Sequence, residues 1–299
     1  MLGVIILNWN AAADTLACLG SVLAWETLTP RVWVVDNASS GDDVAQIRAA
    51  FPAVSMIQND NNAGFAGGNN AGIAVALDAG CEEILLLNND ATITEEDVLR
   101  LQAVLRMQPH IGIVGPALWD ADRPDTLLSA GGKDIATHIV SHNYTLPDQA
   151  EYLETDYVPG TCVLFRAALF RTIGLLDEAY FFGGEVADFC ARARPAGFIS
   201  VIAPQARAYH RLARSSTSRE QFHIYYVLRN RFLYVRKFYP RRRWNLFALW
   251  VGYGLYVTAL AMMQRKRWRA RAALLGVLDG VRGRYGGQNA RILGRQGKA

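Results

Sequence analysis

Short apolar segments alternate with helix-forming stretches along the first ninety residues, and this alternation restricts the possible folds more than any other feature. Residues 3–7, 31–35 and 84–87 are rich in valine, isoleucine and leucine and have the length of buried strands. Residues 11–24 and 72–79 have helical composition. Strands separated by helices predict an α/β fold with a largely parallel sheet that helices cover on both faces.

Polar side chains follow each predicted strand directly. They are Asn8, Asn10, Asp36, Asn37, Asn88, Asn89 and Asp90. Ligands of open α/β sheets bind outside the carboxyl ends of the strands, so we expect these side chains to meet at one crevice. An alternative for Asp36 and Asn37 is that they cap the helix that follows them.

A glycine-rich segment, residues 61–72 with the sequence NNAGFAGGNNAG, is predicted to border the same crevice. Gly64 and Gly68 allow the backbone to approach a ligand closely, and Asn69 adds an amide donor. The segment lacks the G-x-G-x-x-G spacing of dinucleotide-binding folds and the lysine of a P-loop, which disfavours both kinds of site. A flexible turn without a ligand is the alternative.

Eight segments between residue 3 and about residue 240 together resemble the inverting nucleotide-sugar glycosyltransferases of family 2, especially the bacterial rhamnosyltransferase-like branch. They are ILNWN, VVDNASSGD, NNAGFAGGNNAG, LLLNNDA, VPGTCVLFR, GEVADFCARARPAGF, the AYH that ends at His210, and LRNRFLYVRK. The resemblance implies a GT-A fold, which is a Rossmann-like α/β domain. It also implies a UDP- or dTDP-sugar donor, possible use of dTDP-rhamnose, and a divalent metal, Mg²⁺ or Mn²⁺.

The resemblance assigns a metal site at the end of the third predicted strand. The family places a D-x-D or N-x-D motif there, and this chain has Asn88-Asn89-Asp90. Asp90 is the predicted metal ligand, because hard carboxylate oxygens suit Mg²⁺ and Mn²⁺. Asn88 is a neutral neighbour that contacts ribose or phosphate. His210, which follows the last core strand, is the predicted second ligand.

The resemblance also assigns the nucleotide site. Asp36 is expected to accept the imide N–H of a uracil or thymine ring. Asn8, Asn10 and Asn37 are predicted neighbours of the base and the ribose. Arg229, in the LRN segment, is predicted to reach the diphosphate.

The acceptor and the catalytic base are predicted on two later segments. Gly160 and Thr161 are expected to form the acceptor wall beneath the sugar. An inverting transferase needs a carboxylate that takes the proton of the acceptor hydroxyl. The family usually has E-D-x-D there, whereas this chain has Glu185, Val186, Ala187 and Asp188.

The replacement of the second acid by valine leaves two candidates for the base. Glu185 stands at the predicted start of a helix, where the helix dipole stabilises a carboxylate, and it is the favoured candidate. Asp188 lies within the first turn, where it acts as the base, caps the helix or pairs with Arg192. The substitution also leaves open a catalytically silent binding or scaffold protein.

Charge divides the chain into two regions. Residues 1–206 carry 10 basic and 25 acidic side chains, a net charge of −15, and residues 207–299 carry 21 basic and 2 acidic side chains, a net charge of +19. We therefore predict a catalytic domain over residues 1–206 and a basic helical region over residues 207–299, which meets a polyanion.

The uncharged aromatic-rich stretch 244–264 lies between two basic clusters and predicts an anionic membrane surface as that polyanion. Nucleic acid is not expected, because the aromatic residues lie in an apolar run and not among the arginines. The stretch is long enough either to span a bilayer or to lie in the interface. A buried helical hairpin of a soluble domain is the alternative.

These predictions combine into one expected function. The chain is expected to be an enzyme that transfers a sugar to a glycan or polyprenyl-linked acceptor at the cytoplasmic side of the cell membrane. Four scattered cysteines without metal spacing and the absence of a signal peptide fit that location. A sugar nucleotidyltransferase is an alternative.

Overall fold

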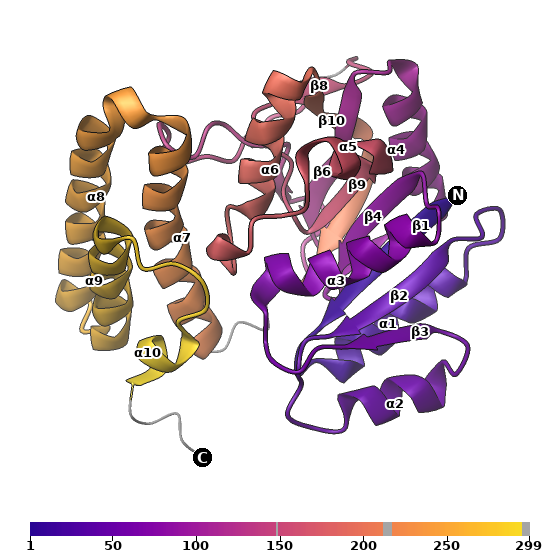
Figure 1. Cartoon of the computed structure of the whole chain (residues 1–299), viewed down its shortest axis with the longest axis horizontal. Coiled ribbons are helices and arrows are strands. Elements are labelled where there is room, and N and C mark those ends of the chain that lie inside the picture. Colours follow the sequence, from indigo (N-terminus) through magenta and orange to yellow (C-terminus); the bar gives the residue numbers. More distant parts are fainter. Residues whose placement is uncertain (148, 212–216, 295–299) are drawn as a thin grey trace.

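The structure, a computed structural model, describes residues 1–147, 149–211 and 217–294 (Figure 1). The strands are β1 (Leu2–Asn8), β2 (Arg31–Asp36), β3 (Ser55–Gln58), β4 (Glu83–Asn88), β5 (Ala91–Ile93), β6 (Ile111–Asp120), β7 (Leu127–Ser129), β8 (Leu153–Thr155), β9 (Cys162–Arg166) and β10 (Ile199–His210). The helices are α1 (Ala12–Leu23), α2 (Asp43–Ala50), α3 (Gly64–Asp78), α4 (Glu95–Met107), α5 (Ala167–Ile173), α6 (Glu185–Ala193), α7 (Thr217–Phe238), α8 (Arg243–Met263), α9 (Arg267–Arg282) and α10 (Asn289–Leu293).

The strands form one mixed sheet in the order β3-β2-β1-β4-β9-β6-β10-β5. The half that contains β3, β2, β1 and β4 is parallel, as the sequence predicts. β9 is inserted antiparallel between β4 and β6, and β5 pairs antiparallel with β10. The sheet therefore combines a parallel half with a second half that brings later segments to the same edge.

Helices cover both faces of the sheet, as predicted, because alternate strand residues point to opposite sides. On one face, Ile5 and Leu86 belong to a core with side chains of α3, α5 and α6. On the other face, Ile6 and Leu85 belong to a core with side chains of α1, α2 and α4. Each such buried aliphatic side chain stabilises the fold by about 1.5–3 kcal/mol.

The parallel register brings the polar strand ends together. Asn8 at the end of β1 is the register partner of Asp36 at the end of β2. On its other side, Leu7 of β1 is the partner of Asn88 at the end of β4. The three polar segments therefore meet at one edge of the sheet, as expected.

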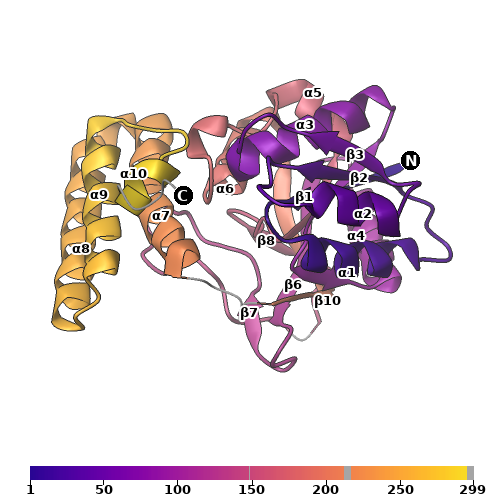
Figure 2. The ribbon, with the colours of Figure 1, turned by 90° about the horizontal axis from the view of Figure 1, so that it is seen from below.

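The helical region after β10 packs as one unit against the α/β part of the chain. Figures 1 and 2 show α7, α8 and α9 side by side, with α7 nearest the sheet and α8 at the outer end. Trp250 of α8 donates its indole N–H to the backbone carbonyl of Ala136, 2.8 Å away. The predicted boundary at residue 206 falls inside β10, which continues to His210.

Candidate active site

Asp36 is held rigidly at the end of β2. Asn8 is fully buried and donates its side-chain N–H to Oδ1 of Asp36 at 2.8 Å and to Oδ2 of Asp43 at 3.1 Å. Ser39 donates its backbone N–H to Oδ2 of Asp36 (3.1 Å) and its hydroxyl to Oδ1 (2.6 Å). A carboxylate has about four acceptor positions, so Asp36 retains one for a ligand. Asn8 orients that carboxylate from the buried side.

Asn10 occupies the rim of the same edge. Its side-chain oxygen accepts the backbone N–H of Ser40 at 2.7 Å, and its backbone N–H donates to Oγ of Ser39 at 2.9 Å. The residue has a φ of 51°, a left-handed conformation that asparagine tolerates better than most residues. Asn10 therefore fixes the turn after β2 and is exposed beside Asp36.

The predicted glycine loop is helical from Gly64 onward. Several of its residues contact other parts of the protein. A Cβ atom on Gly68 would lie 2.4 Å from Leu7, so this glycine allows α3 to pack closely on β1. Asn69 donates its side-chain N–H to the carbonyl of Phe65 within α3. Asn37 is buried and donates to the carbonyl of Gly64 at 3.0 Å. These contacts give the residues structural roles, and their contacts with a donor stay predictions.

Gly64 has a φ of 73° and lies against the segment that precedes α6. A Cβ atom at this position would lie 2.3 Å from the carbonyl oxygen of Phe181. The next backbone N–H, that of Phe65, donates to the same oxygen at 2.6 Å. Glycine is required here because α3 approaches the backbone of another segment closely.

Asp90 and His210 lie next to each other, as the predicted metal site requires. Ala91 of β5 pairs with His210 of β10, and Nε2 of His210 is 3.1 Å from Oδ1 of Asp90. Arg219 of α7 donates to Oδ2 of Asp90 at 2.7 Å. Burial alone would raise the pKa of the Asp90 carboxyl, but the hydrogen bond from His210 and the charge of Arg219 hold that pKa below its usual value.

These residues fit part of a divalent-metal site. A carboxylate and an imidazole are common ligands of Mn²⁺ and related ions. Within the described ranges, no cluster of three histidine, cysteine, aspartate or glutamate side chains is placed to hold a metal. A metal at Asp90 and His210 would take its remaining ligands from donor oxygens and water, and Arg219 would have to share or release Oδ2 of Asp90.

The other two residues of the motif point to different neighbours. Asn89 donates its side-chain N–H to Oγ1 of Thr15 on α1 at 2.9 Å. Thr15 in turn donates to Oδ1 of Asn8 at 2.7 Å, so Asn89 joins the network behind Asp36. Asn88 donates its backbone N–H to the carbonyl of Thr161 at 2.9 Å. Its half-buried side chain stays a predicted donor contact.

Gly160 and Thr161 connect the metal motif with the predicted base. Thr161 precedes β9 and is bonded to Asn88 through its carbonyl. A Cβ atom on Gly160 would lie 3.1 Å from the side chain of Val186. The valine that replaces the usual second acid is buried and packs beneath Gly160. The acceptor wall predicted at residues 160 and 161 thus lies between β4 and the start of α6.

Glu185 has the environment of a general base. It is the first residue of α6 and is 5% exposed. Its Oε2 atom has no hydrogen-bond partner among the described residues. Burial raises the pKa of the Glu185 carboxyl to about 7, and hydrogen bonds from the backbone N–H groups of Glu185 and Gly183 only partly oppose that rise. A carboxylate with a pKa near the working pH is well suited to take a proton.

Asp188 has the environment of a structural anion. Oδ2 accepts the Nε–H of Arg192 at 2.7 Å, and Oδ1 is paired with Nζ of Lys237 on α7. The side chain is fully buried between these two cations. Both oxygens are therefore engaged, whereas Oε2 of Glu185 has no hydrogen-bond partner in the described part of the chain.

Arg229 does not occupy the predicted position at the diphosphate. It is fully buried, and its guanidinium donates to the backbone carbonyls of Ala179, Tyr180 and Gly286. The same group lies over the ring of Tyr226, 4.7 Å from its centroid. A guanidinium with its N–H groups used in this way is structural, and we correct the prediction accordingly.

Comparison with known proteins decides the family. Residues 3–174 match the family described as Glycosyl transferase family 2. The chain belongs to that family. It is 24% identical over 290 residues to the low-salt glycan biosynthesis hexosyltransferase Agl10 of Haloferax volcanii, an alignment that covers 95% of this chain and 92% of that protein. It is 26% identical over 273 residues to the dTDP-rhamnosyl transferase RfbF of Shigella flexneri, covering 86% and 88% of the two chains.

Solved structures confirm the predicted GT-A fold. The mannosyltransferase PcManGT from Pyrobaculum calidifontis, solved with GDP-Man and Mn²⁺, superposes with a TM-score of 0.60 at 14% identity and covers 95% of this chain and 87% of that chain. GalNAc-T7, solved with UDP, GalNAc and Mn²⁺, superposes with a TM-score of 0.59 at 17% identity over 79% and 47% of the two chains. The protein is therefore a family 2 glycosyltransferase with rhamnosyltransferase-like relatives.

Sequence reasoning missed several residues of this glycosyltransferase site. Thr15 lies inside an ordinary amphipathic helix, and Asp43 looks like a helix-start residue, so neither carries a motif. Arg219 is one of many arginines in the basic region, and only the fold brings it to Asp90. The SSGDD segment, residues 39–43, was the available signal, because Ser39 and Asp43 both contact the strand-end network.

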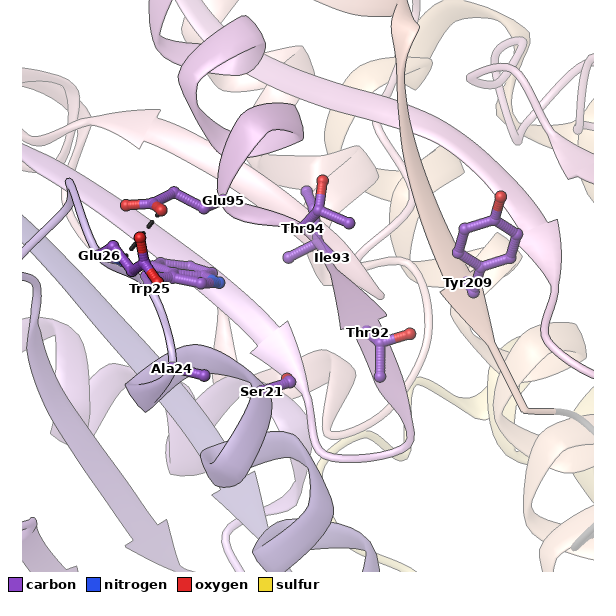
Figure 3. A pocket seen from close by; sticks show the side chains of 9 residues that line it. All are labelled: Ser21, Ala24, Trp25, Glu26, Thr92, Ile93, Thr94, Glu95 and Tyr209. Atoms are coloured by element: carbon purple, nitrogen blue, oxygen red, sulfur yellow. Dashed lines mark hydrogen bonds between the residues drawn. The ribbon is translucent and has the colours of Figure 1, made fainter.

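A separate pocket of about 400 Å³ lies beside β5 (Figure 3). Its lining includes Trp25, Thr92 and Tyr209. Glu95 closes one side by accepting the backbone N–H of Glu26 at 3.0 Å. Tyr209 and His210 are consecutive strand residues and point to opposite faces of β10. The pocket therefore lies on the opposite face of the β5–β10 strand pair from Asp90 and His210.

Proposed function

We propose that this glycosyltransferase moves a sugar from a UDP- or dTDP-sugar, with dTDP-rhamnose as the first candidate, to a hydroxyl acceptor with inversion. The observation that carries the proposal is the buried Glu185 carboxylate, which has an unpartnered oxygen within the described structure and a pKa raised to about 7. Family membership supplies the reaction class, and the name of one relative, a dTDP-rhamnosyl transferase, supports the donor.

The proposed reaction needs one proton transfer and one displacement. Glu185 takes the proton of the acceptor hydroxyl while the hydroxyl oxygen attacks the anomeric carbon of the donor. The new carbon–oxygen bond forms as the bond from that carbon to the β-phosphate oxygen breaks, and the nucleoside diphosphate leaves with its electron pair. In-line attack from the opposite face inverts the anomeric configuration.

The strand ends would hold the donor during this reaction. Asp36 accepts the imide N–H of the pyrimidine, with Asn10 at the rim beside it. Asp90 and His210 would hold a divalent metal, Mg²⁺ or Mn²⁺, whose charge stabilises the departing diphosphate. Gly160 would border the acceptor, and its lack of a side chain allows the backbone to lie close to Val186 and Phe65.

A panel of donors tests the proposed function. We expect dTDP- and UDP-sugars with Mn²⁺ to raise the Tm of the protein, whereas ADP-glucose and GDP-mannose raise it less, because Asp36 is held to read the pyrimidine edge. The preferred donor is then incubated with a lipid-linked acceptor extract, and release of UDP or dTDP is measured. Release of pyrophosphate would indicate a nucleotidyltransferase, and preference for a purine donor would contradict the assigned role of Asp36.

We further propose that the acceptor is linked to a polyprenyl lipid and that the enzyme works at the cytoplasmic surface of the membrane. One relative, from Mycobacterium tuberculosis, is named an N-acetylglucosaminyl-diphospho-decaprenol L-rhamnosyltransferase, and it is 26% identical over 207 residues, which cover 62% of this chain and 67% of that protein. The basic C-terminal region supports the same location, because cytoplasmic leaflets carry anionic lipids.

The outer face of α8 is the proposed membrane-binding surface. By length and composition, residues Pro240–Met263 would be able to cross a bilayer, and an 18-residue window within them has a mean hydropathy of 1.7. The inner face of α8 is packed, however: Trp250 is fully buried, and the Arg231 guanidinium lies 4.2 Å from the centroid of its ring. A helix fixed along the catalytic domain in this way favours binding in the membrane interface over spanning.

The exposed side chains of α8 fit a lipid surface. Large apolar residues on the outer face include Trp244, Leu255, Tyr256, Met262 and Met263. Arginine and lysine clusters at 241–243 and 265–269 flank the two ends of the helix. Such a face combines apolar insertion with attraction to anionic headgroups, the two terms that bind amphipathic helices to membranes.

Replacing Leu255 and Met262 together by glutamate should weaken binding to vesicles that contain anionic phosphatidylglycerol. We expect at least about a tenfold loss of partitioning in a sedimentation assay, because two apolar side chains are removed and negative charge is added. The matched control replaces Val140 and Tyr144, two exposed apolar residues outside α8, by glutamate. Equal binding by the α8 variant and the wild type would contradict the membrane surface, as would an equal loss in the control.

A further inference from the structure

The turn that leads into Glu185 has a backbone conformation that ordinary residues avoid. Phe181, Gly183 and Gly184 have φ angles of 62°, 79° and 101°. A non-glycine residue with a positive φ is strained and persists only when its surroundings hold it. The turn at residues 179–184, called here the base turn, therefore depends on tertiary contacts.

Side chains of α7 supply most of those contacts. Asn230, which is 2% exposed, donates its side-chain amide to the carbonyls of Tyr180 (3.0 Å), Phe182 (2.9 Å) and Gly183. Arg229 donates to the carbonyl of Tyr180 at 2.7 Å and to that of Ala179 at 3.2 Å. These two neighbours on α7 thus bind four of the five consecutive carbonyls from 179 to 183.

The remaining carbonyl, that of Phe181, is bound by the start of α3. The backbone N–H of Phe65, in the first turn of α3, donates to the carbonyl of Phe181. All five carbonyls are therefore satisfied by segments distant in sequence, as buried backbone groups require. The base turn is held between the glycine-rich start of α3 and the middle of α7.

The orientation of the Asn230 amide is itself determined. Its Oδ1 atom accepts the Nε–H of Arg229 at 2.9 Å and an Nη2–H at 2.7 Å. A guanidinium only donates, so the oxygen must face Arg229 and the NH₂ group must face the base turn. Seven residues later on the same helix, Lys237 binds Asp188 of α6. The helix α7 therefore contacts the chain both before Glu185, through Asn230, and after it, through Lys237.

We propose that Asn230, oriented by Arg229, is a positioning residue that sets the Glu185 carboxylate for proton transfer, an inference that rests on the proposed function. Glu185 is the second residue after Gly183, whose carbonyl Asn230 binds and whose N–H contacts the carboxylate. A displacement of about 1 Å at a reacting group lowers rates by as much as about 100-fold. Asn230 acts through the turn and does not contact substrate.

Substitution of Asn230 tests the proposal. We expect Asn230→Ala to lower kcat about 10- to 100-fold, while the KM for the donor changes less than about threefold. Asn230→Ser keeps one hydroxyl donor and should lose less activity, which preserves the test if the alanine variant folds poorly. The pH at which kcat is half-maximal should fall below the wild-type value near 7, because a loosened turn admits water to the carboxyl of Glu185.

Tyr234→Phe is the matched control. Tyr234 is also buried on α7, but its hydroxyl donates to Oδ2 of Asp134 at 3.3 Å and not to the base turn. The control should lose stability comparable to that of the Asn230 variants and keep the wild-type kcat and pH midpoint. Folded Asn230 variants with wild-type kcat and midpoint would overturn the positioning role, and so would an equal kcat loss in Tyr234→Phe. If the wild type itself transfers no sugar, the proposed function fails instead.

Discussion

Glu185→Gln is expected to lower kcat by roughly 10²- to 10⁴-fold, the usual range for loss of a general base. The amide keeps the size of the side chain but has no basic oxygen to take the acceptor proton. Affinities for the donor and for Mn²⁺ should stay near wild-type values, because the strand-end residues proposed to bind them are unchanged. Single-turnover transfer and isothermal titration of the donor measure the two effects separately.

Asp188→Asn provides the comparison that distinguishes the two acids. Its carboxylate is buried between Arg192 and Lys237, so the neutral amide should destabilise the fold by about 3 kcal/mol while the folded fraction still transfers sugar. The opposite pattern, a stable Asp188 variant with no transfer beside an active Glu185 variant, would move the base to Asp188.

The pH dependence of Glu185 gives a second signature. Because kcat requires the ionised carboxylate, kcat of the wild type should rise with pH and be half-maximal near pH 7. The raised pKa also means that the folded state keeps a proton that the unfolded state loses between about pH 4.5 and 7, so wild-type stability falls over this window. Glu185→Gln does not titrate and should be more stable at pH 8, by up to about 3 kcal/mol, and equally stable at pH 4. A less stable variant at pH 8 would contradict the burial argument.

Asp90→Asn should abolish metal-dependent donor binding and lower transfer at least about 100-fold, since a bound metal contributes several kcal/mol of charge stabilisation. The fold should survive, because an asparagine oxygen still accepts hydrogen bonds from His210 or Arg219. The thermal shift that Mn²⁺ and dTDP together produce in the wild type is the direct measurement, and EDTA should remove it.

Asp97→Asn is a suitable control for this experiment. Asp97 is also a buried carboxylate bonded to an arginine, Arg100, but it lies at the start of α4 away from the strand ends. It should keep the Mn²⁺-dependent shift. Full activity of Asp90→Asn, or of the wild type in EDTA, would exclude a catalytic metal at Asp90.

The parallel half of the sheet was predictable because its signal is local. Runs such as residues 31–35 and 84–87 have strand length and composition, and parallel strands necessarily end at one edge. The polar strand ends Asp36 and Asp90 were therefore found without any tertiary information. The antiparallel insertion of β9 was not predictable, because pairing between β4 and β9 joins segments about eighty residues apart and leaves no pattern in either.

The glycine-rich segment was predicted to let a ligand approach the backbone closely, and in the structure its glycines let protein segments pack closely. Glycine lets the backbone lie close to another group, but the sequence alone does not identify that group. At Gly68 the two groups are α3 and β1, and at Gly64 they are the start of α3 and the carbonyl of Phe181. Arg229 was misassigned for a similar reason, since a guanidinium binds backbone carbonyls as well as phosphates.

The sequence by itself determined the α/β architecture, the family, the carboxylates of the site and the basic, apolar C-terminal segment, because each depends on residue type at short spacing. The tertiary structure alone decided which acid is paired with cations. Glu185 and Asp188 lie three residues apart on α6, and only the position of α7 places Lys237 on Asp188 and Asn230 on the base turn. Burial with no cation bound to it among the described residues raises the pKa of the Glu185 carboxyl, whereas Arg192 and Lys237 bind the Asp188 carboxylate. The local sequence does not determine either environment.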